Sequence, residues 1–213
     1  MSDVWSGRAR LYVDSDAHRG GADLEQIVAW AEGARSAVDV ATGGGHVARR
    51  LREAGIDVVT CDPAPGMQPD VVCRAESLPF ADGCVDVVAC RTAAHHFADV
   101  RKAVSEMARV SADRVLIVDT VHMGDAVEEA EKLRDPSHVR NYTDAEWREI
   151  VREAGLGVDD ARFYEHSMDF VAWLARTGCE GDDARRVAAL LGDRVADGRL
   201  TLTKIAIKAR KER

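Results

Sequence analysis

The sequence predicts an α/β protein built on a doubly wound, mostly parallel, seven-stranded sheet with an antiparallel strand at one edge. Short apolar runs alternate with segments of helical composition along most of the chain, which is typical of parallel strands covered by helices on both faces. Near the C-terminus, residues 161–164 and 200–208 alternate like half-exposed strands. The 213 residues and 46% hydrophobic content suit one globular domain, 1–213.

The first elements are a helix, a strand, a glycine turn and a second helix. Asp23 and Gln26 have the spacing of a capping box, which predicts a helix that runs to Trp30. The apolar run 37–40 predicts the first strand. Three consecutive glycines follow it, and residues 46–54 have helical composition that ends before a glycine.

Four further apolar runs predict the remaining parallel strands, at residues 58–61, 71–73, 85–90 and 115–118. A helix over residues 98–110 separates the last two of them, with its valines on one stripe. Thr143, with Glu146 three residues later, predicts a capped helix that Gly155 ends. Residues 169–198 are expected to form one or two helices.

Composition and charge exclude several classes of protein. A formal net charge of −8 opposes nucleic-acid binding, because such proteins concentrate Lys and Arg against phosphates. No run approaches eighteen apolar residues and the N-terminus lacks an apolar signal core, so we expect no membrane span, no export signal and a cytoplasmic location. The five cysteines contain no CxxC pair and indicate neither a zinc site nor a disulfide framework.

The stretch SAVDVATGGGHVARRL, residues 36–51, predicts a nucleotide-type site. In a doubly wound sheet, ligands bind beyond the carboxyl ends of the strands, and glycines let the backbone approach a ligand closely. Asp62 follows about twenty residues later, at the tip of the second strand, where a carboxylate can take both ribose hydroxyls. A plain tight loop is the alternative. Dinucleotide enzymes carry GxGxxG, whereas these glycines are contiguous.

At this point the sequence resembles the class I S-adenosylmethionine-dependent methyltransferases. Their motif, an acid followed by GxGxG at the end of the first strand, falls here on Asp39, Ala41, Gly43 and Gly45, with Ala41 replacing the first glycine. The stretch RAESLPFADGCVDVVACRTAAHHFADVRKAVSEMARV, residues 74–110, is similar to the methyltransferase type 11 group related to quinone-biosynthesis methyltransferases. The resemblance covers about residues 10–165.

This resemblance implies a Rossmann-like methyltransferase fold, S-adenosylmethionine as cofactor and S-adenosylhomocysteine as product. Methyl transfer would reach an O, N or C nucleophile of a small molecule. The domain then divides into an N-terminal lid and helix segment, a cofactor-binding half and a substrate-side half, at residues 1–35, 36–120 and 121–213.

The resemblance also implies the cofactor contacts. Asp39, with the backbone of Ala41 and Gly43, would face the methionine ammonium group, and Asp62 would face the ribose. The backbone N–H of Ala75 would meet the adenine edge. Arg91 would lie beside the methionine moiety.

Two departures from the family pattern concern the adenine end. Arg74 stands where the family has an adenine-binding acid, so Glu76 or a main-chain carbonyl would have to substitute. In DPAPGMQPD, residues 62–70, nine residues with three prolines connect the second and third strands, where the family has a helix. We expect that helix to be missing and an extended loop to leave the adenine end open, unless another subunit of a homodimer covers it.

Histidines follow the fourth and fifth strands, whose tips are neighbours in this fold. His95 and His96 come after the fourth strand, and Asp119 and His122 after the fifth. A histidine there could deprotonate the acceptor, because its pKa of about 6.5 suits a base. The alternatives are that His95 and His96 shape the pocket or cap the next helix. A metal site formed by these four residues is disfavoured, and we expect no metal.

The expected substrate contacts are His122, together with three residues of LRDPSHVRNYTDAEW, residues 133–147: His138, Arg140 and Tyr142. Such residues, with Arg134, could bind an acidic or aromatic molecule; alternatively the arginines are solvated or paired and Trp147 anchors its helix in the core. Tyr12 and His18 are expected to form a lid or an ordinary capping loop. A solvated helix face is expected for Glu128, Glu129, Glu131 and Lys132.

Two other functions stay open. An S-adenosylmethionine-binding protein that no longer methylates is the first alternative, because of Arg74 and the shortened loop. A nicotinamide-dependent oxidoreductase is the second, although it would need GxGxxG.

Overall fold

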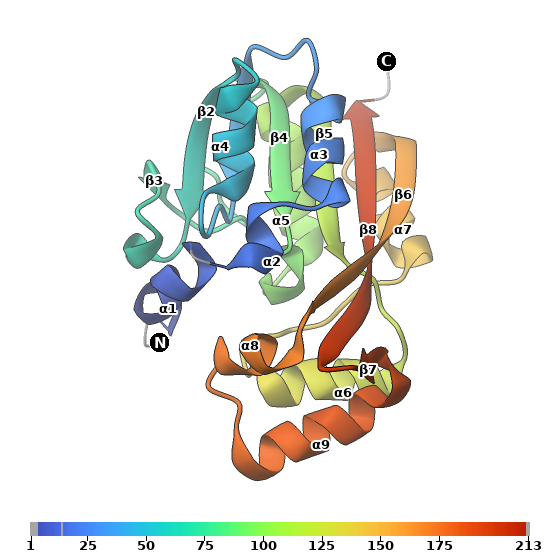
Figure 1. Cartoon of the computed structure of the whole chain (residues 1–213). Helices are drawn as coiled ribbons and strands as arrows, with labels where there is room; N and C mark the ends of the chain where they lie inside the picture. The colour runs from blue at the N-terminus through green and yellow to red at the C-terminus, as the bar shows by residue number, and fades with distance from the viewer. Residues whose placement is uncertain (1–3, 14, 212–213) are drawn as a thin grey trace.

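A computed structural model describes residues 4–13 and 15–211 of the chain. Figure 1 shows a twisted sheet with α3 (Ala22–Trp30) and α4 (His46–Glu53) in front of it and α5 (Val100–Val110) behind it. Buried side chains of α3 and α4 form one apolar cluster with the sheet, and those of α5 and α7 (Asp144–Glu153) form another on its opposite face. The predicted doubly wound architecture is confirmed.

The main sheet has the strand order β3-β2-β1-β4-β5-β8-β6. The parallel strands are β1 (Ser36–Val40), β2 (Asp57–Asp62), β3 (Val71–Val72), β4 (Val85–Arg91) and β5 (Ser111–Thr120). Two long antiparallel strands, β6 (Leu156–Asp169) and β8 (Arg199–Lys211), complete it. The predicted seven strands and antiparallel edge are therefore present. The two-residue β7 (Val195–Ala196), which pairs with β8, was not predicted.

The order reverses at β1 and β4, which are hydrogen-bonded neighbours although β2 and β3 lie between them in the sequence. In open α/β sheets the crevice at such a reversal is where ligands bind. The glycine turn after β1 and the histidines after β4 therefore meet at one end of the sheet.

Of the two capping boxes predicted from the sequence, one is present in the structure and one is not. Thr143 and Glu146 form the predicted capping box of α7, with the Glu146 N–H donating to Thr143 Oγ1 at 3.2 Å. The capping box at Asp23 is wrong, because Gly21 is the N-cap of α3 and makes no side-chain cap. Asp23 lies inside the helix and is buried, and its carboxylate binds two cations instead.

The loop between β2 and β3 contains only a short 3₁₀ turn, η1 (Pro65–Met67), so the predicted absence of a helix is confirmed. The N-terminal helix α1 (Val4–Val13) lies against this turn, and the Gly66 N–H donates to Ser6 Oγ at 2.7 Å. A segment of the same chain, α1, therefore lies over this loop. The expected role of Tyr12 concerns a side chain outside the described residues.

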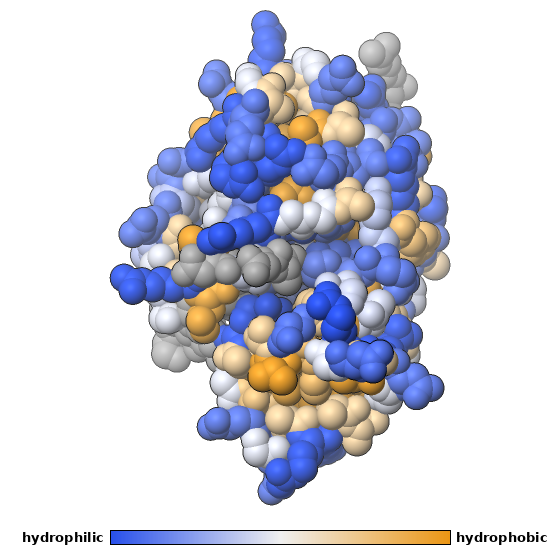
Figure 2. Space-filling view, in the orientation of Figure 1, coloured by the Kyte–Doolittle hydropathy of each residue, from blue (hydrophilic) through white to orange (hydrophobic). Residues whose placement is uncertain are grey.

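The distal parts of β6 and β8 leave the sheet and carry a lower unit, visible at the bottom of Figure 1. It contains α6 (Asp125–Arg134), α8 (Phe170–Ala175), α9 (Gly181–Leu191) and the 3₁₀ turn η3 (Gly192–Arg194). A separate apolar cluster, which includes Trp173, Val187 and Leu200, holds these elements together. Figure 2 shows further hydrophobic side chains on the surface of this unit.

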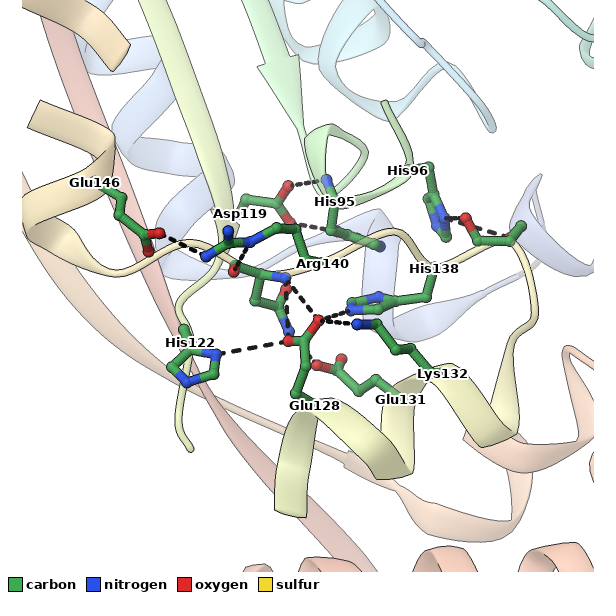
Figure 3. A network of polar contacts seen from close by, with 12 residues as sticks. His95, His96, Asp119, His122, Glu128, Glu131, Lys132, His138, Arg140 and Glu146 are labelled. Carbon is green, nitrogen blue, oxygen red and sulfur yellow. Dashed lines mark hydrogen bonds and ion pairs between the residues drawn. The ribbon is translucent and has the colours of Figure 1, made fainter. Parts of the chain in front are cut away.

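The expected solvated face of α6 is only partly present. Glu129 and Lys132 are exposed, but Glu131 is buried and the Glu128 carboxylate points toward the segment 138–141 (Figure 3). The charge pattern misled because α6 packs against α9 on one side and against the segment 138–141 on another, so that two sides of it are covered. No helix among residues 4–13 and 15–211 is both long and apolar enough to span a bilayer.

Candidate cofactor and methyl-transfer site

The glycine turn takes its shape from left-handed backbone conformations. Ala41, Gly43 and Gly45 have φ angles of 54°, 50° and 73°. Positive φ angles raise the conformational energy of residues that have a Cβ atom. This explains why a glycine is favoured at the position of Ala41. Gly45 is the N-cap of α4, so the turn directs the start of that helix toward the cavity.

Asp39 is the penultimate residue of β1, just before this turn, and is 1% exposed. Its Oδ2 accepts hydrogen bonds from Thr42 Oγ1 at 2.6 Å and from the Ala48 N–H at 3.1 Å. Burial raises the pKa of this carboxyl to about 6. A cation placed beside Asp39 would stabilise its charged form, so the site fits the ammonium group of a methionine moiety.

Asp62 ties the glycine turn to the loop after β2. Its Oδ2 accepts from the Gly43 N–H at 3.0 Å, and its Oδ1 accepts from the Ala64 N–H at 2.9 Å. Each carboxylate oxygen can accept more than one hydrogen bond. The carboxylate is thereby fixed in a position where it can still accept from two hydroxyls of a ribose.

These residues border a cavity of about 770 Å³, which we call the cofactor cavity. Seven of the eight predicted cofactor residues line it: Asp39, Ala41, Gly43, Asp62, Ala75, Glu76 and Arg91. Gly45 lies outside this lining, at the N-cap of α4. The lining also includes Trp5, Met67, Thr92 and Phe97, for which no sequence pattern gave a signal.

Glu76 has a partly structural role at the adenine end. Its Oε1 accepts from the backbone N–H of Ala98 at 2.9 Å, just before α5, and its Oε2 lies 3.4 Å from Arg74 Nε. Arg74 therefore pairs with Glu76, the residue that was expected to replace the family's adenine-binding acid.

Arg91, at the end of β4, holds the N-terminal segment over the cavity. Its Nε and Nη2 bind the Asp23 carboxylate at 2.8 and 3.1 Å. Its Nη1 donates to the His18 carbonyl oxygen at 2.8 Å, and Nη2 also donates to that of Gly20 at 3.0 Å. This guanidinium therefore anchors residues 18–23 beside the cavity that it also lines.

His95 forms a buried pair with Asp119, which ends β5 (Figure 3). His95 Nδ1 lies 2.6 Å from Asp119 Oδ1, and the His95 backbone N–H donates to Asp119 Oδ2 at 2.8 Å. Burial lowers the pKa of His95, but the Asp119 carboxylate outweighs it, so the net shift is upward. The pair therefore makes His95 more basic than a free imidazole.

His96 differs from its neighbour, although both belong to the 3₁₀ turn η2 (Ala94–His96). Its Nδ1 lies 3.1 Å from the Ser137 carbonyl oxygen, which can only accept, so Nδ1 is assigned the proton. Burial and the adjacent His95 lower the pKa of His96 to about 3. A neutral His96 lines the cofactor cavity. The Trp5 ring meets the His96 ring edge-on there, with 4.7 Å between the ring centroids.

The four expected substrate residues lie outside the lining of this cavity. His138 Nε2 lies 3.2 Å from Glu128 Oε1, and His122 Nδ1 lies 3.7 Å from Glu128 Oε2. Arg140 is exposed, pairs with Glu146 and lies over the Tyr142 ring, which in turn packs against Trp147 in the core. Trp147 is fully buried, as its alternative role as a core anchor required.

The four residues considered as a metal site separate into two groups. His95, His96 and Asp119 stay together, while His122 lies beside Glu128 (Figure 3). Among the described residues, Glu128, Glu131 and His138 could each offer one ligand atom to an ion, within 4.8 Å of one another. Their carboxylates already accept from His138, Lys132 and Asn141.

Comparison with known proteins agrees with this geometry. The family described as "Methyltransferase domain" matches residues 38–130. Over 207 residues the chain is 30% identical to the uncharacterized methyltransferase YcgJ of Bacillus subtilis, covering 86% of this chain and 82% of that protein. The chain belongs to the class I S-adenosylmethionine-dependent methyltransferases.

Two further comparisons support this membership. The crystal structure of the Bacillus subtilis YcgJ protein superposes with a TM-score of 0.80 at 28% identity, covering 90% of this chain and 98% of that one. Demethylmenaquinone methyltransferase of Paenarthrobacter aurescens is 33% identical over 97 residues, which is 40% of this chain and 38% of that protein. This methyltransferase therefore uses S-adenosylmethionine, as the sequence predicted, and nothing supports the two other functions that were left open.

Proposed function

We propose that this methyltransferase acts on a small-molecule acceptor and that His95 is its general base. The observation that carries the proposal is the 2.6 Å contact between His95 Nδ1 and Asp119 Oδ1. It fixes the tautomer whose Nε2 can take a proton, and it raises the basicity of that nitrogen. The neutral His96 and the strained Thr92, with φ of 56°, form the adjacent wall.

The cofactor supplies a methyl group already activated by its sulfonium. In the proposed arrangement Asp39 holds the ammonium group, Asp62 the ribose hydroxyls and the Ala75 N–H the adenine edge. The chain then has to align the acceptor and exclude water, which can contribute roughly 7–11 kcal/mol to lowering the barrier. In this role His95 would accept the proton that the acceptor loses on methylation, which would leave S-adenosylhomocysteine as the product.

Between the two predicted catalytic histidines, charge state favours His95. A base is most effective when its pKa lies near the working pH. The pKa of His96, at about 3, is far below that range, whereas that of His95 is raised above 6.5. His96 is therefore assigned to shaping the pocket, and Asp119 is a positioning residue.

Calorimetric titration with S-adenosylhomocysteine, followed by acceptor screening, tests the proposal. We expect micromolar binding in the wild-type chain and a loss of at least tenfold in Asp62→Ala. His95→Gln should retain cofactor binding and lose activity. His122→Gln serves as the matched control, because His122 lies beside Glu128 and not in the His95–Asp119 pair. Equal activity of His95→Gln and His122→Gln would contradict the role of His95.

The remaining predictions concern partners and location. The net charge of −8 supports a small molecule rather than nucleic acid as acceptor. A homodimer and a cytoplasmic location stay predictions. Sedimentation of the purified chain, with and without S-adenosylhomocysteine, tests the first.

A further inference from the structure

A second, smaller cavity of about 60 Å³ adjoins the cofactor cavity; we call it the side chamber. Thr92 and His96 line both cavities, and the proposed base His95 lines the side chamber. The rings of His95 and His96 are 4.1 Å apart between centroids, so the base lies beside the boundary of the two cavities. A methyl acceptor that meets both the cofactor and His95 must therefore lie at this boundary, next to Thr92.

The backbone of Thr92 has a conformation that its residue type disfavours. Its φ angle is 56°, and among residues 4–13 and 15–211 it is the only β-branched residue with a positive φ. Such a residue is an outlier in the left-handed region, because its branched Cβ crowds the backbone. The Thr92 N–H donates to the Val118 carbonyl oxygen of β5 at 2.6 Å, which holds this conformation in place. Strained residues of this kind cluster at ligand-binding and catalytic sites.

The hydroxyl group of Thr92 carries a donor hydrogen that the protein itself does not use. Lys204 Nζ lies 3.2 Å from Thr92 Oγ1, and an ammonium group can only donate, so Oγ1 accepts in this contact. In the part of the chain that the structure describes, Thr92 Oγ1 makes no second hydrogen bond. The hydroxyl hydrogen is therefore directed away from Lys204 and is available to a ligand at the boundary of the cavities.

Lys204 is suited to hold the hydroxyl in this orientation. It is 2% exposed, and its Nζ also donates to Asp23 Oδ2 at 3.2 Å, which fixes its position. Burial lowers the pKa of Lys204 to about 8, although Asp23 opposes this shift, so the side chain is still mostly charged at neutral pH. A charged Lys204 cannot take the hydroxyl hydrogen, and its own hydrogen bond polarises the O–H group that donates to a ligand.

We infer that Thr92 is a specificity-determining residue whose hydroxyl donates a hydrogen bond to the reacting oxygen of the methyl acceptor, so that the acceptor is a hydroxyl compound rather than an amine. This inference rests on the proposed function. An amine nitrogen has a single lone pair, which methylation occupies, so it cannot accept from Thr92 at the same time. A hydroxyl oxygen has a second lone pair for this bond. When His95 takes the hydroxyl proton, negative charge develops on that oxygen, and a donor placed beside it stabilises the charge.

The cofactor also carries oxygens that accept hydrogen bonds, on the carboxylate of its methionine moiety. Asp39 and Gly43, which would hold that moiety, line the cofactor cavity and not the side chamber. Lys204 lines the side chamber and not the cofactor cavity, and its bond to Thr92 Oγ1 turns the hydroxyl toward that side. This placement favours an oxygen of the acceptor, and the binding of S-adenosylhomocysteine to a Thr92 variant separates the two sources.

Calorimetric titration of the complex with S-adenosylhomocysteine, using para-nitrophenol and para-nitroaniline as probes, tests the inference. The two probes share one ring and differ in the group that would meet Thr92, because a phenolate oxygen accepts hydrogen bonds whereas an amino group donates them. We expect the phenolate to bind about tenfold more tightly than the aniline. The visible absorption of the bound phenol should also show a pKa below that of the free phenol, because a donor stabilises its anion.

Variants of Thr92 isolate the contribution of its hydroxyl. Thr92→Val keeps the branched shape and removes the hydroxyl, so it should lose most of the preference for the phenolate, whereas Thr92→Ser should keep it. Thr203→Val is the matched control, because Thr203 lies on β8 beside Lys204 and outside the linings of both cavities, and its Oγ1 donates to Glu165 Oε1 at 3.0 Å.

Equal binding of the two probes to the wild-type complex, or no binding of either, would overturn the inference. It is also overturned if folded Thr92→Val keeps the preference. The same holds if Thr92→Val weakens S-adenosylhomocysteine binding as strongly as phenolate binding, because the hydroxyl would then serve the cofactor. If Thr92→Val does not fold, Thr92→Ala provides the same comparison. Failure of the proposed function shows separately, as absence of S-adenosylhomocysteine binding to the wild-type chain or as unchanged activity in His95→Gln.

Discussion

Arg91 Nε lies 2.8 Å from Asp23 Oδ2, and both side chains are only 3% exposed, although 68 residues separate them in the sequence. Lys204 approaches the same carboxylate oxygen from β8. One buried acid thus joins the N-terminal segment, the end of β4 and the antiparallel edge. The site depends on this contact, because Arg91 also lines the cofactor cavity.

Breaking this contact should destabilise the protein strongly. Asp23→Ala leaves two buried cations without their carboxylate, a change that typically costs about 3–5 kcal/mol of unfolding free energy. Urea denaturation measures it. The control is Glu25→Ala on the same helix, whose exposed pair with Arg50 should contribute far less stability, because solvent screens it. Similar losses in both variants would contradict this account.

The contact should also show in acid. Burial raises the pKa of Asp23, but Lys204 and Arg91 outweigh it and hold the pKa well below its ordinary value of 3.8. A lowered folded-state pKa contributes stability above the unfolded-state pKa, and this contribution is lost as the pH falls below it. The unfolding free energy of the wild type should therefore fall more steeply below about pH 4 than that of Asp23→Asn.

Cofactor affinity should depend on the ionisation of Asp39. The pKa of this buried carboxyl is about 6, and a methionine ammonium group requires its charged form. At pH 5 about a tenth of the molecules would have Asp39 ionised, so S-adenosylhomocysteine should bind roughly tenfold more weakly than at pH 7.5. Calorimetric titration with S-adenosylhomocysteine between pH 5 and 7.5 measures this change in affinity. Asp39→Asn should bind weakly at both pH values, and an unchanged pH dependence in that variant would rule Asp39 out.

The features that were predicted correctly from the sequence depend on patterns within short stretches of residues. The glycine turn, Asp62 and the Thr143 capping box each lie within a short stretch, and all were placed correctly. The missing helix followed from three prolines in nine residues. Short-range steric and hydrogen-bonding rules are sufficient at such positions.

The parts that were missed depend on contacts distant in sequence. Asp23 has the spacing of a capping residue, and only the cations supplied by β4 and β8 turn it into a buried ion-pair partner. Glu131 has the context of a solvated helix face until the segment 138–141, through Asn141, covers it. No periodicity in the sequence reports such long-range pairing.

Glu131 should make the protein less stable at neutral pH than at mildly acidic pH. Burial raises the pKa of this carboxyl from 4.5 to about 7. A raised folded-state pKa contributes stability that is present below the unfolded-state value and is lost as the pH rises through the folded-state value. Between pH 4.5 and 7.5 the unfolding free energy should therefore fall by about 3 kcal/mol and then level off.

Glu131→Gln should remove most of that loss, because a neutral amide can still accept from Asn141 Nδ2. Urea titrations at the two pH values compare it with Glu129→Gln, an exposed neighbour that pairs with Arg186. If both variants lose stability with pH as the wild type does, the buried carboxyl is not responsible.

The pH dependence of methyl transfer should follow His95. Burial lowers the pKa of His95, but the Asp119 carboxylate raises it by more, so the net pKa lies above 6.5. A general base acts when neutral, and kcat should therefore rise with pH through an inflection above 6.5 and then level off. Asp119→Asn keeps the acceptor for the His95 backbone N–H but removes the charge, so the inflection should move to lower pH while kcat falls about 10²- to 10⁴-fold. Rates measured with the acceptor found by screening, with His96→Gln as the comparison, decide between the histidines. An inflection that stays in place in Asp119→Asn but disappears in His96→Gln would assign the base to His96.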